Sequence, residues 1–145
     1  MRSPSRSLSG FAWAAMVLIP LASAARAAEA TSTGDWLIED ATARVRISAC
    51  GADLCGNVSW IQAGAPTVDA NNPDEAKRSR PLLGSAVLLG LRPTGPSQWT
   101  GSLYNAEDGR TYTGKLTIVD ENHVKVAGCV LGGLICKSQT WTRVK

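Results

Sequence analysis

Short strand-like segments recur along this chain from residue 35 to the C-terminus, with turn residues between them. The segment 43–49 is typical, because Val45 and Ile47 alternate with polar neighbours as in a strand with one buried face. Many short strands with regularly spaced turn signals predict an all-β barrel or sandwich. We expect strands at residues 35–39, 43–49, 56–62, 82–91, 98–104, 111–119, 123–129 and 138–144.

The segment 82–91 is continuously apolar apart from Ser85, which predicts a strand buried on both faces. A helix is the alternative interpretation, but Gly84, Gly90 and the β-branched Val87 favour a strand.

The first 30 residues predict a cleavable signal peptide. Basic residues precede an apolar run at 11–22, and two A-x-A sites follow it, ending at Ala27 and Ala30. A membrane anchor is the less favoured alternative, because the run is about a dozen residues long and a spanning helix needs roughly 20. We therefore expect residues 31–145 to form a single domain that is periplasmic or secreted and has no membrane span.

The net charge of the chain comes from this N-terminal segment. The chain has 15 Lys and Arg residues against 12 Asp and Glu residues, for a formal charge of +3. Arg2, Arg6 and Arg26 all lie in the first 27 residues, which contain no acid, so the remainder has 12 basic and 12 acidic residues and is neutral. A neutral domain argues against general nucleic-acid binding.

Four cysteines, Cys50, Cys55, Cys129 and Cys136, suit an oxidising compartment. Three pairings are possible, and we favour Cys50–Cys55 and Cys129–Cys136 because each pair brackets a turn. Each disulfide would close a short ring worth about 2–2.5 kcal/mol. A zinc site made by all four thiolates is disfavoured by the spacing of the second pair, and we expect no metal and no cofactor.

Two residues far apart in the sequence would become neighbours in a closed barrel. If eight strands run up and down around a barrel, Trp36 in the first strand and Arg143 in the last lie at the same end. The sequence Gly34-Asp35-Trp36 resembles the G-x-W signature of the lipocalin superfamily, in which a late Arg stacks on the Trp and closes the barrel. An ordinary core Trp and an unrelated surface Arg are the alternative.

A second resemblance covers nearly all of residues 31–145. Its motifs are Gly34-x-Trp36, Val45-Arg46-Ile47, Cys50-Gly51 with Leu54-Cys55-Gly56, Trp60, Asp69-x-x-Asn72-Pro73-Asp74, Arg78-x-Arg80-Pro81-Leu82-Leu83-Gly84, Trp99-x-Gly101, Tyr104, Asp108-Gly109, Tyr112 and Gln139-Thr140-Trp141-x-Arg143. In this order they resemble the exported bacterial proteins of domain of unknown function 2147. The resemblance implies a lipocalin-like eight-stranded antiparallel barrel and assigns no activity.

The long polar stretch at 63–81 contains the candidate site. It carries a short helix candidate at 73–77, with Asn72 as N-cap and Asp74 near the positive end. In one interpretation this loop covers the open mouth of the barrel, and Arg78 or Arg80 binds a carboxylate or phosphate. In the other it is a salt-bridged loop, because Asp74 and Arg78 are four residues apart.

The leading functional hypothesis is a periplasmic barrel that binds a small hydrophobic or amphiphilic molecule, with aromatic side chains as apolar wall. The candidate ligand-binding residues are Trp60, Asp69, Asn72, Asp74, Arg78, Arg80, Trp99 and Tyr112. The alternative is a non-enzymatic cell-envelope interaction or assembly protein with a filled core and an exposed apolar patch.

Catalysis is not expected, because no catalytic motif is recognisable. A hydrolase using Asp69 and Asp74 would need the two carboxylates to converge in one pocket. His123 begins a strand beside a turn and has no second His, which indicates a surface position.

Overall fold

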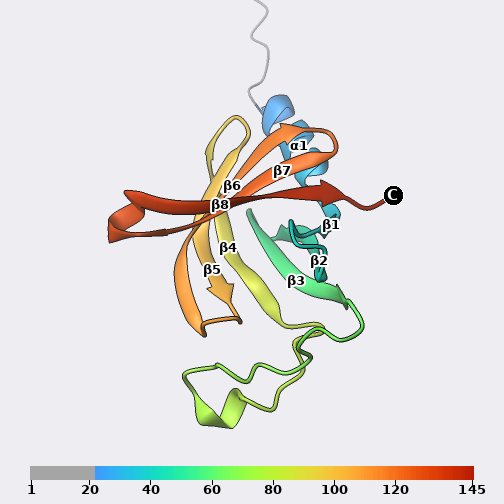
Figure 1. The fold of residues 1–145 in the computed structure, drawn as a ribbon. Helices are drawn as coiled ribbons and strands as arrows, with labels where there is room; N and C mark the ends of the chain where they lie inside the picture. The colour runs from blue at the N-terminus through green and yellow to red at the C-terminus, as the bar shows by residue number, and fades with distance from the viewer. Residues whose placement is uncertain (1–21) are drawn as a thin grey trace, which may run out of the picture.

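Eight antiparallel strands close into an up-and-down barrel in which each strand pairs with the next and β8 returns to β1 (Figure 1). The structure, a computed structural model, describes residues 22–145. The elements are α1 (Ala22–Ser32), β1 (Gly34–Leu37), β2 (Ala43–Cys50), β3 (Asp53–Ile61), η1 (Glu75–Lys77), β4 (Ala86–Gly95), β5 (Gln98–Asn105), β6 (Arg110–Asp120), β7 (His123–Val130), η2 (Leu131–Gly133) and β8 (Ile135–Arg143). The predicted fold class is confirmed.

The largest difference from the predicted strands is at β4. The strand begins at Ala86, and Leu82 and Leu83 belong to the end of the long loop. Leu89 is exposed on the outer face of the barrel, so the prediction of burial on both faces is wrong. The apolar run spans two different structures. Leu82 faces the interior cavity from the loop, and the strand that follows has only one buried face.

Helix α1 was not predicted, and its alanine-rich sequence has high helix propensity. It overlaps the end of the predicted signal peptide at 1–30, most of which lies outside the described residues, so cleavage stays a prediction. No helix within residues 22–145 has the length and apolar character needed to cross a membrane.

Trp36 and Arg143 lie directly opposite each other where β1 pairs with β8. The Arg143 guanidinium lies 4.3 Å from the centre of the Trp36 ring, and it donates hydrogen bonds to the carbonyl oxygens of Thr33 at 2.9 Å and Glu121 at 2.7 Å. Gly34 has a φ of 124°, and a Cβ there would lie 2.8 Å from Arg143 Nη1. The G-x-W glycine therefore leaves room for the arginine that closes this end.

The hydrophobic core fills the half of the barrel next to this closed end. Trp36 is fully buried at the end of the core nearest the closed end of the barrel. The Trp36 indole nitrogen donates to the carbonyl oxygen of Ser32 at 2.9 Å. The buried core residues are Trp36, Val45, Ile47, Leu54, Leu88, Leu91, Trp99, Leu116, Val124, Val126 and Trp141.

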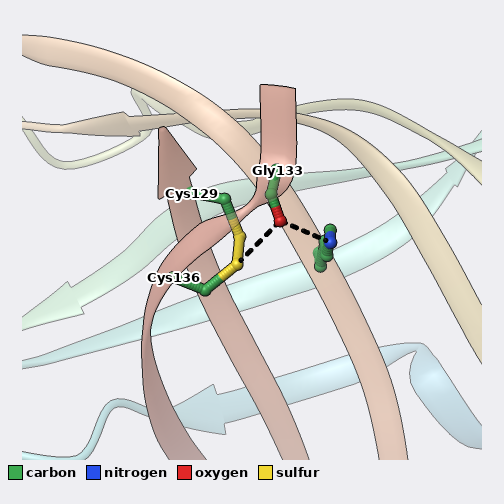
Figure 2. Close-up of a disulfide and its surroundings, with 4 residues drawn as sticks. Cys129, Gly133 and Cys136 are labelled. Atoms are coloured by element: carbon green, nitrogen blue, oxygen red, sulfur yellow. Dashed lines mark hydrogen bonds between the residues drawn. A yellow bond between two sulfur atoms is a disulfide. The ribbon is translucent and has the colours of Figure 1, made fainter. Parts of the chain in front are cut away.

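Both predicted disulfides are present. Cys50–Cys55 links the β2–β3 hairpin at the closed end, and Cys129–Cys136 joins opposed residues of the β7–β8 hairpin at the open end (Figure 2). The local pairings are confirmed, and all four sulfurs are used in disulfides rather than in a thiolate zinc site.

Candidate ligand-binding cavity

A cavity of about 840 Å³ occupies the open half of the barrel. Its floor is the upper surface of the core, formed by Val45, Leu88, Val126 and Trp141. Its side walls are mainly aliphatic and include Val58, Ile61, Val87 and Leu103. The barrel is thus packed solid at one end and hollow at the other.

The mouth of the cavity is polar. Lys137 and Gln139 line it from β8, and Asp40, Glu107 and Asp108 line it from the two neighbouring turns. Lys137 is the only Lys or Arg on the wall within the described residues, so carboxylates outnumber cations there.

The long loop between β3 and β4 forms part of the cavity wall and is fixed to the barrel by the buried Asp69. One Asp69 carboxylate oxygen accepts a hydrogen bond from the Tyr104 hydroxyl at 2.6 Å. The other accepts from the Asn72 amide at 2.8 Å and pairs with the Arg80 guanidinium at 2.8 Å. These contacts join both ends of the loop to β5.

The Asp69 network shifts the pKa of both of its acidic members. Burial by itself raises the pKa of Asp69, but the hydrogen bonds from Tyr104, Asn72 and Arg80 and the Arg80 charge together bring it below 3.8. Burial and the Asp69 carboxylate raise the pKa of Tyr104 to about 12. Asp69 is therefore ionised, and Tyr104 protonated, at neutral pH.

The loop has a second attachment at the β5–β6 turn. The Asn71 amide donates to the carbonyl oxygen of Glu107 at 2.8 Å. Gly109 has a φ of 70°, and a Cβ there would lie 1.8 Å from the Asn71 carbonyl oxygen. The close approach of loop and turn therefore depends on glycine at this position, and it fixes the side of the cavity mouth.

The structure places Trp60 outside the cavity. Val45 pairs with Val58 but Arg44 pairs with Trp60, so Ser59 is an extra residue in β3. This β-bulge reverses the inside–outside alternation, and Ile61 lines the cavity in place of Trp60. Trp60 is 37% exposed beneath the Arg44 guanidinium, so it does not form part of the apolar wall for which it was a candidate.

Of the other two predicted aromatic wall residues, only Tyr112 lines the cavity. Its hydroxyl donates to Asp108 at the mouth. Trp99 stands at the start of β5 near the closed end, where it is buried in the core below the cavity.

Asp74, Arg78 and Arg80 lie outside the main cavity. Asp74, rather than Asn72, is the N-cap of η1, and its carboxylate accepts from the Ala76 amide at 3.1 Å. Arg78 pairs with Glu75 at 3.5 Å instead of Asp74, because the 3₁₀ turn brings residues three apart together.

A smaller hollow of about 280 Å³ lies outside the cavity. Asn72 and Arg80 line it, together with Lys77 and Tyr104. The structure thus brings Asp69, Asn72 and Arg80 together as one network, and it separates them from Trp60, Trp99 and Tyr112.

Sequence reasoning did not select Lys137, Gln139 or Trp141 as cavity residues. Alternation along the last strand indicates them, since Lys137, Gln139, Trp141 and Arg143 are every second residue and share one face. Because Arg143 lies over the buried Trp36 ring, alternation places the other three on the same inner face of β8.

Comparison with known proteins places this chain in a family. The sequence profile of the family described as "uncharacterized protein conserved in bacteria" (DUF2147) matches residues 34–143. The chain belongs to this family. The match to DUF2147 spans all eight strands and begins at Gly34 of the G-x-W motif, in agreement with the resemblance found in the sequence. Among curated proteins, none matches the chain.

The barrel of this DUF2147 member is similar to that of protein HP1028 from the human pathogen Helicobacter pylori, which is described as belonging to the lipocalin family. The TM-score is 0.70, the sequence identity is 20%, and the match covers 78% of this chain and 82% of that one. At this identity the likeness shows a shared lipocalin-like fold.

Proposed function

We propose that this protein binds a small, mainly apolar molecule in the open half of its barrel. The observation that carries the proposal is the cavity of about 840 Å³ with its aliphatic and aromatic walls. Ligand pockets are commonly about 300–1,000 Å³ with apolar walls and a few placed polar groups. An eight-stranded barrel of the lipocalin type is wide enough to hold one small ligand.

The polar groups at the mouth support an amphiphile whose polar end carries no negative charge. Arg78 and Arg80, the two arginines considered for an anionic end, already have partners within the loop. An anionic end at the mouth would meet Lys137 but also Asp40, Glu107 and Asp108. We therefore expect a polar end without a negative charge, such as an alcohol, that contacts Gln139.

A comparison of three ten-carbon ligands tests this choice of polar end. We expect decanol and decylamine to bind more tightly than decanoate at neutral pH, measured by displacement of the neutral probe N-phenyl-1-naphthylamine. Lys137→Gln should weaken decanoate and leave decanol unchanged. Tighter binding of decanoate than of decanol by the unaltered chain would contradict the choice.

The alternative of an envelope interaction protein rests on a filled core. A filled barrel would have no interior space, whereas this one has a cavity above its core. We therefore favour ligand binding inside the barrel.

The arrangement of carboxylates favours binding over hydrolysis. Asp69 is fully buried, and both of its oxygens already have hydrogen-bond partners. Asp74 caps η1 from a position outside the main cavity. Neither carboxylate is placed to act as a catalytic acid or base on a molecule in the barrel. Within residues 22–145 no cluster of three or more His, Cys, Asp or Glu side chains could hold a metal ion.

We further propose that the protein is exported to the periplasm or secreted, with residues 1–30 removed. Two disulfides suit an oxidising compartment. Arg143 donates to the backbone carbonyls of Thr31 and Thr33, so a mature chain that begins at or before Thr31 keeps both contacts. Cell fractionation and the intact mass of the released protein test this proposal, and a cytoplasmic chain with its first 30 residues attached would contradict it.

Native mass spectrometry of protein purified from its own cells tests ligand binding itself. We expect a fraction of the molecules to carry a retained small molecule, which organic extraction should release and identify. Repeated absence of a retained molecule, together with failure to take up added lipids, would contradict the proposal.

A further inference from the structure

The turn of the β7–β8 hairpin carries a cluster of exposed aliphatic side chains. Leu134 is 86% exposed and Leu131 is 69% exposed, and Val130 and Ile135 beside them are also exposed. We call residues 130–135 the hairpin tip. Figure 1 shows this turn projecting at the end of β8 that is opposite the C-terminus.

Contacts at the base of the hairpin tip fix its conformation. Cys129–Cys136 joins the two strands directly under it. The Lys115 ammonium donates to the carbonyl oxygen of Gly133 at 3.2 Å, and Cys136 Sγ lies 3.5 Å from the same oxygen (Figure 2). The Leu134 amide donates to the Leu131 carbonyl at 3.4 Å. Apolar side chains are thus presented on a turn in which the Leu131 and Gly133 carbonyls and the Leu134 amide have partners inside the molecule.

The charged side chains next to the hairpin tip are lysines, whereas the carboxylates of the cavity mouth belong to the other turns at this end. Lys115 lies against it, and Lys137 follows it on β8. From residue 122 to the C-terminus the sequence contains four Lys or Arg residues and no Asp or Glu. Aliphatic side chains with flanking lysines match a lipid surface with anionic headgroups.

The shape and chemistry of the hairpin tip favour lipid over a protein partner. Protein interfaces typically concentrate their binding energy in aromatic and Arg side chains that fill pockets. The hairpin tip has neither residue type, and Figure 1 shows its turn projecting from the barrel. It also lies at the open end, where β8 lines the cavity mouth with Lys137 and Gln139.

We propose that the hairpin tip docks this protein on an anionic lipid surface, with the aliphatic side chains in the acyl region and Lys115 and Lys137 at the headgroups. This inference goes beyond ligand binding in the cavity, since docking does not require an occupied barrel. Docking by the hairpin tip would bring the cavity mouth close to the lipid.

Vesicle flotation tests the docking. The chain is expressed with its own N-terminal segment, and the variants are compared in the same processed form, checked by intact mass. Vesicles of phosphatidylethanolamine with phosphatidylglycerol are compared with vesicles of phosphatidylcholine alone. We expect binding to the anionic vesicles, and a loss of about tenfold or more in Leu134→Ser and in Leu131→Asn, because each buried aliphatic side chain contributes substantially to partitioning.

Val119→Ser is the matched control, because Val119 is an exposed aliphatic residue near the other end of the barrel. It should bind vesicles as the unaltered chain does. Equal binding by the Leu134 and control variants, or no binding by the unaltered chain, would overturn the proposal.

Hydrogen exchange on the unaltered chain gives a second readout that does not depend on a variant folding. We expect added anionic vesicles to slow amide exchange in residues 130–135. Slow exchange there without vesicles, in a protein that is dimeric in solution, would assign the hairpin tip to a protein contact and overturn the proposal.

Discussion

Asp69 connects the long loop to the barrel through charged hydrogen bonds in a fully buried position. Replacing it with Asn removes the charge that Arg80 and Tyr104 face. We expect Asp69→Asn to lower the free energy of unfolding by about 2–3 kcal/mol, the usual cost of losing hydrogen bonds to a charged group. Urea unfolding at neutral pH measures this, and an unchanged midpoint and slope would contradict the role of Asp69.

The same residue predicts a pH dependence. The pKa of Asp69 is lowered in the folded state from its ordinary value of 3.8, so the folded state binds its proton less tightly than the unfolded chain. The stabilisation is then complete above about pH 5 and is lost as the pH falls below 3.8. The stability difference between the unaltered chain and Asp69→Asn should therefore shrink on acidification. Thermal unfolding of both proteins at pH 7 and pH 3 measures it, and a constant difference would contradict this prediction.

Gly109 controls how closely the loop approaches the β5–β6 turn. Gly109→Ala places a Cβ against the Asn71 carbonyl oxygen at a positive φ. We expect a loss of about 1–3 kcal/mol in the free energy of unfolding. Gly51→Ala is the control, since Gly51 has a φ of 68° and a Cβ there would meet nothing within 4 Å. Equal losses in the two variants would show that strain, and not the Asn71 contact, accounts for the effect.

At this scale the sequence predicted which loop residues are special but not what they do. Asp69, Asn72 and Arg80 stand out as a polar group in one segment, and their types fit either ligand binding or internal pairing. The choice depends on the path of the loop, which brings Tyr104 of β5 to the Asp69 carboxylate. That long-range contact has no local sequence signal.

Among the elements, β1 and β8 determine whether the barrel closes. Their pairing is short, and Arg143 reinforces it by its position over the Trp36 ring and its bonds to nearby carbonyls. We expect Arg143→Ala to lower the free energy of unfolding by about 2–4 kcal/mol through the lost cation–π contact and charged hydrogen bonds. Arg46→Ala, on the outer face of β2, should cost much less because its ion pair with Asp35 is exposed. Equal costs for the two variants in urea unfolding would contradict the closing role of Arg143.

The strands also show where period-two reasoning fails. Alternation predicted the positions of the strands well, because one face of each strand packs toward the barrel interior. It failed at Trp60, because the extra residue Ser59 reverses the alternation and a bulge leaves no clear mark in composition. A different inference failed at β4, where a continuous apolar run predicted burial on both faces but Leu89 is exposed.

In the molecule as a whole, the division into a filled half and a hollow half could not be predicted from the sequence. The G-x-W motif and Arg143 predicted a closed barrel, and the cysteine spacing predicted both disulfides. The interior volume instead depends on how far Val45, Leu88, Val126 and Trp141 extend across the barrel. The position along the barrel at which these four side chains close the interior depends on their three-dimensional packing.

Gly128 offers the most direct test of whether a ligand enters the cavity. It lines the cavity on β7, and a Cβ there would lie 3.5 Å from the Tyr112 side chain, an ordinary contact distance. A Cβ at this position therefore fits, and Gly128→Leu places the rest of its side chain in the part of the cavity that Gly128 lines. Lys125→Leu is the matched control, since Lys125 is exposed on the outer face of the same strand.

Fluorescence titration with N-phenyl-1-naphthylamine is the deciding measurement. We predict saturable binding of one probe molecule by the unaltered chain and by Lys125→Leu, and binding weakened by about tenfold or more in Gly128→Leu, because the added side chain occupies apolar volume that the probe needs. Equal affinity in all three proteins, with Gly128→Leu fully folded, would contradict binding inside the barrel.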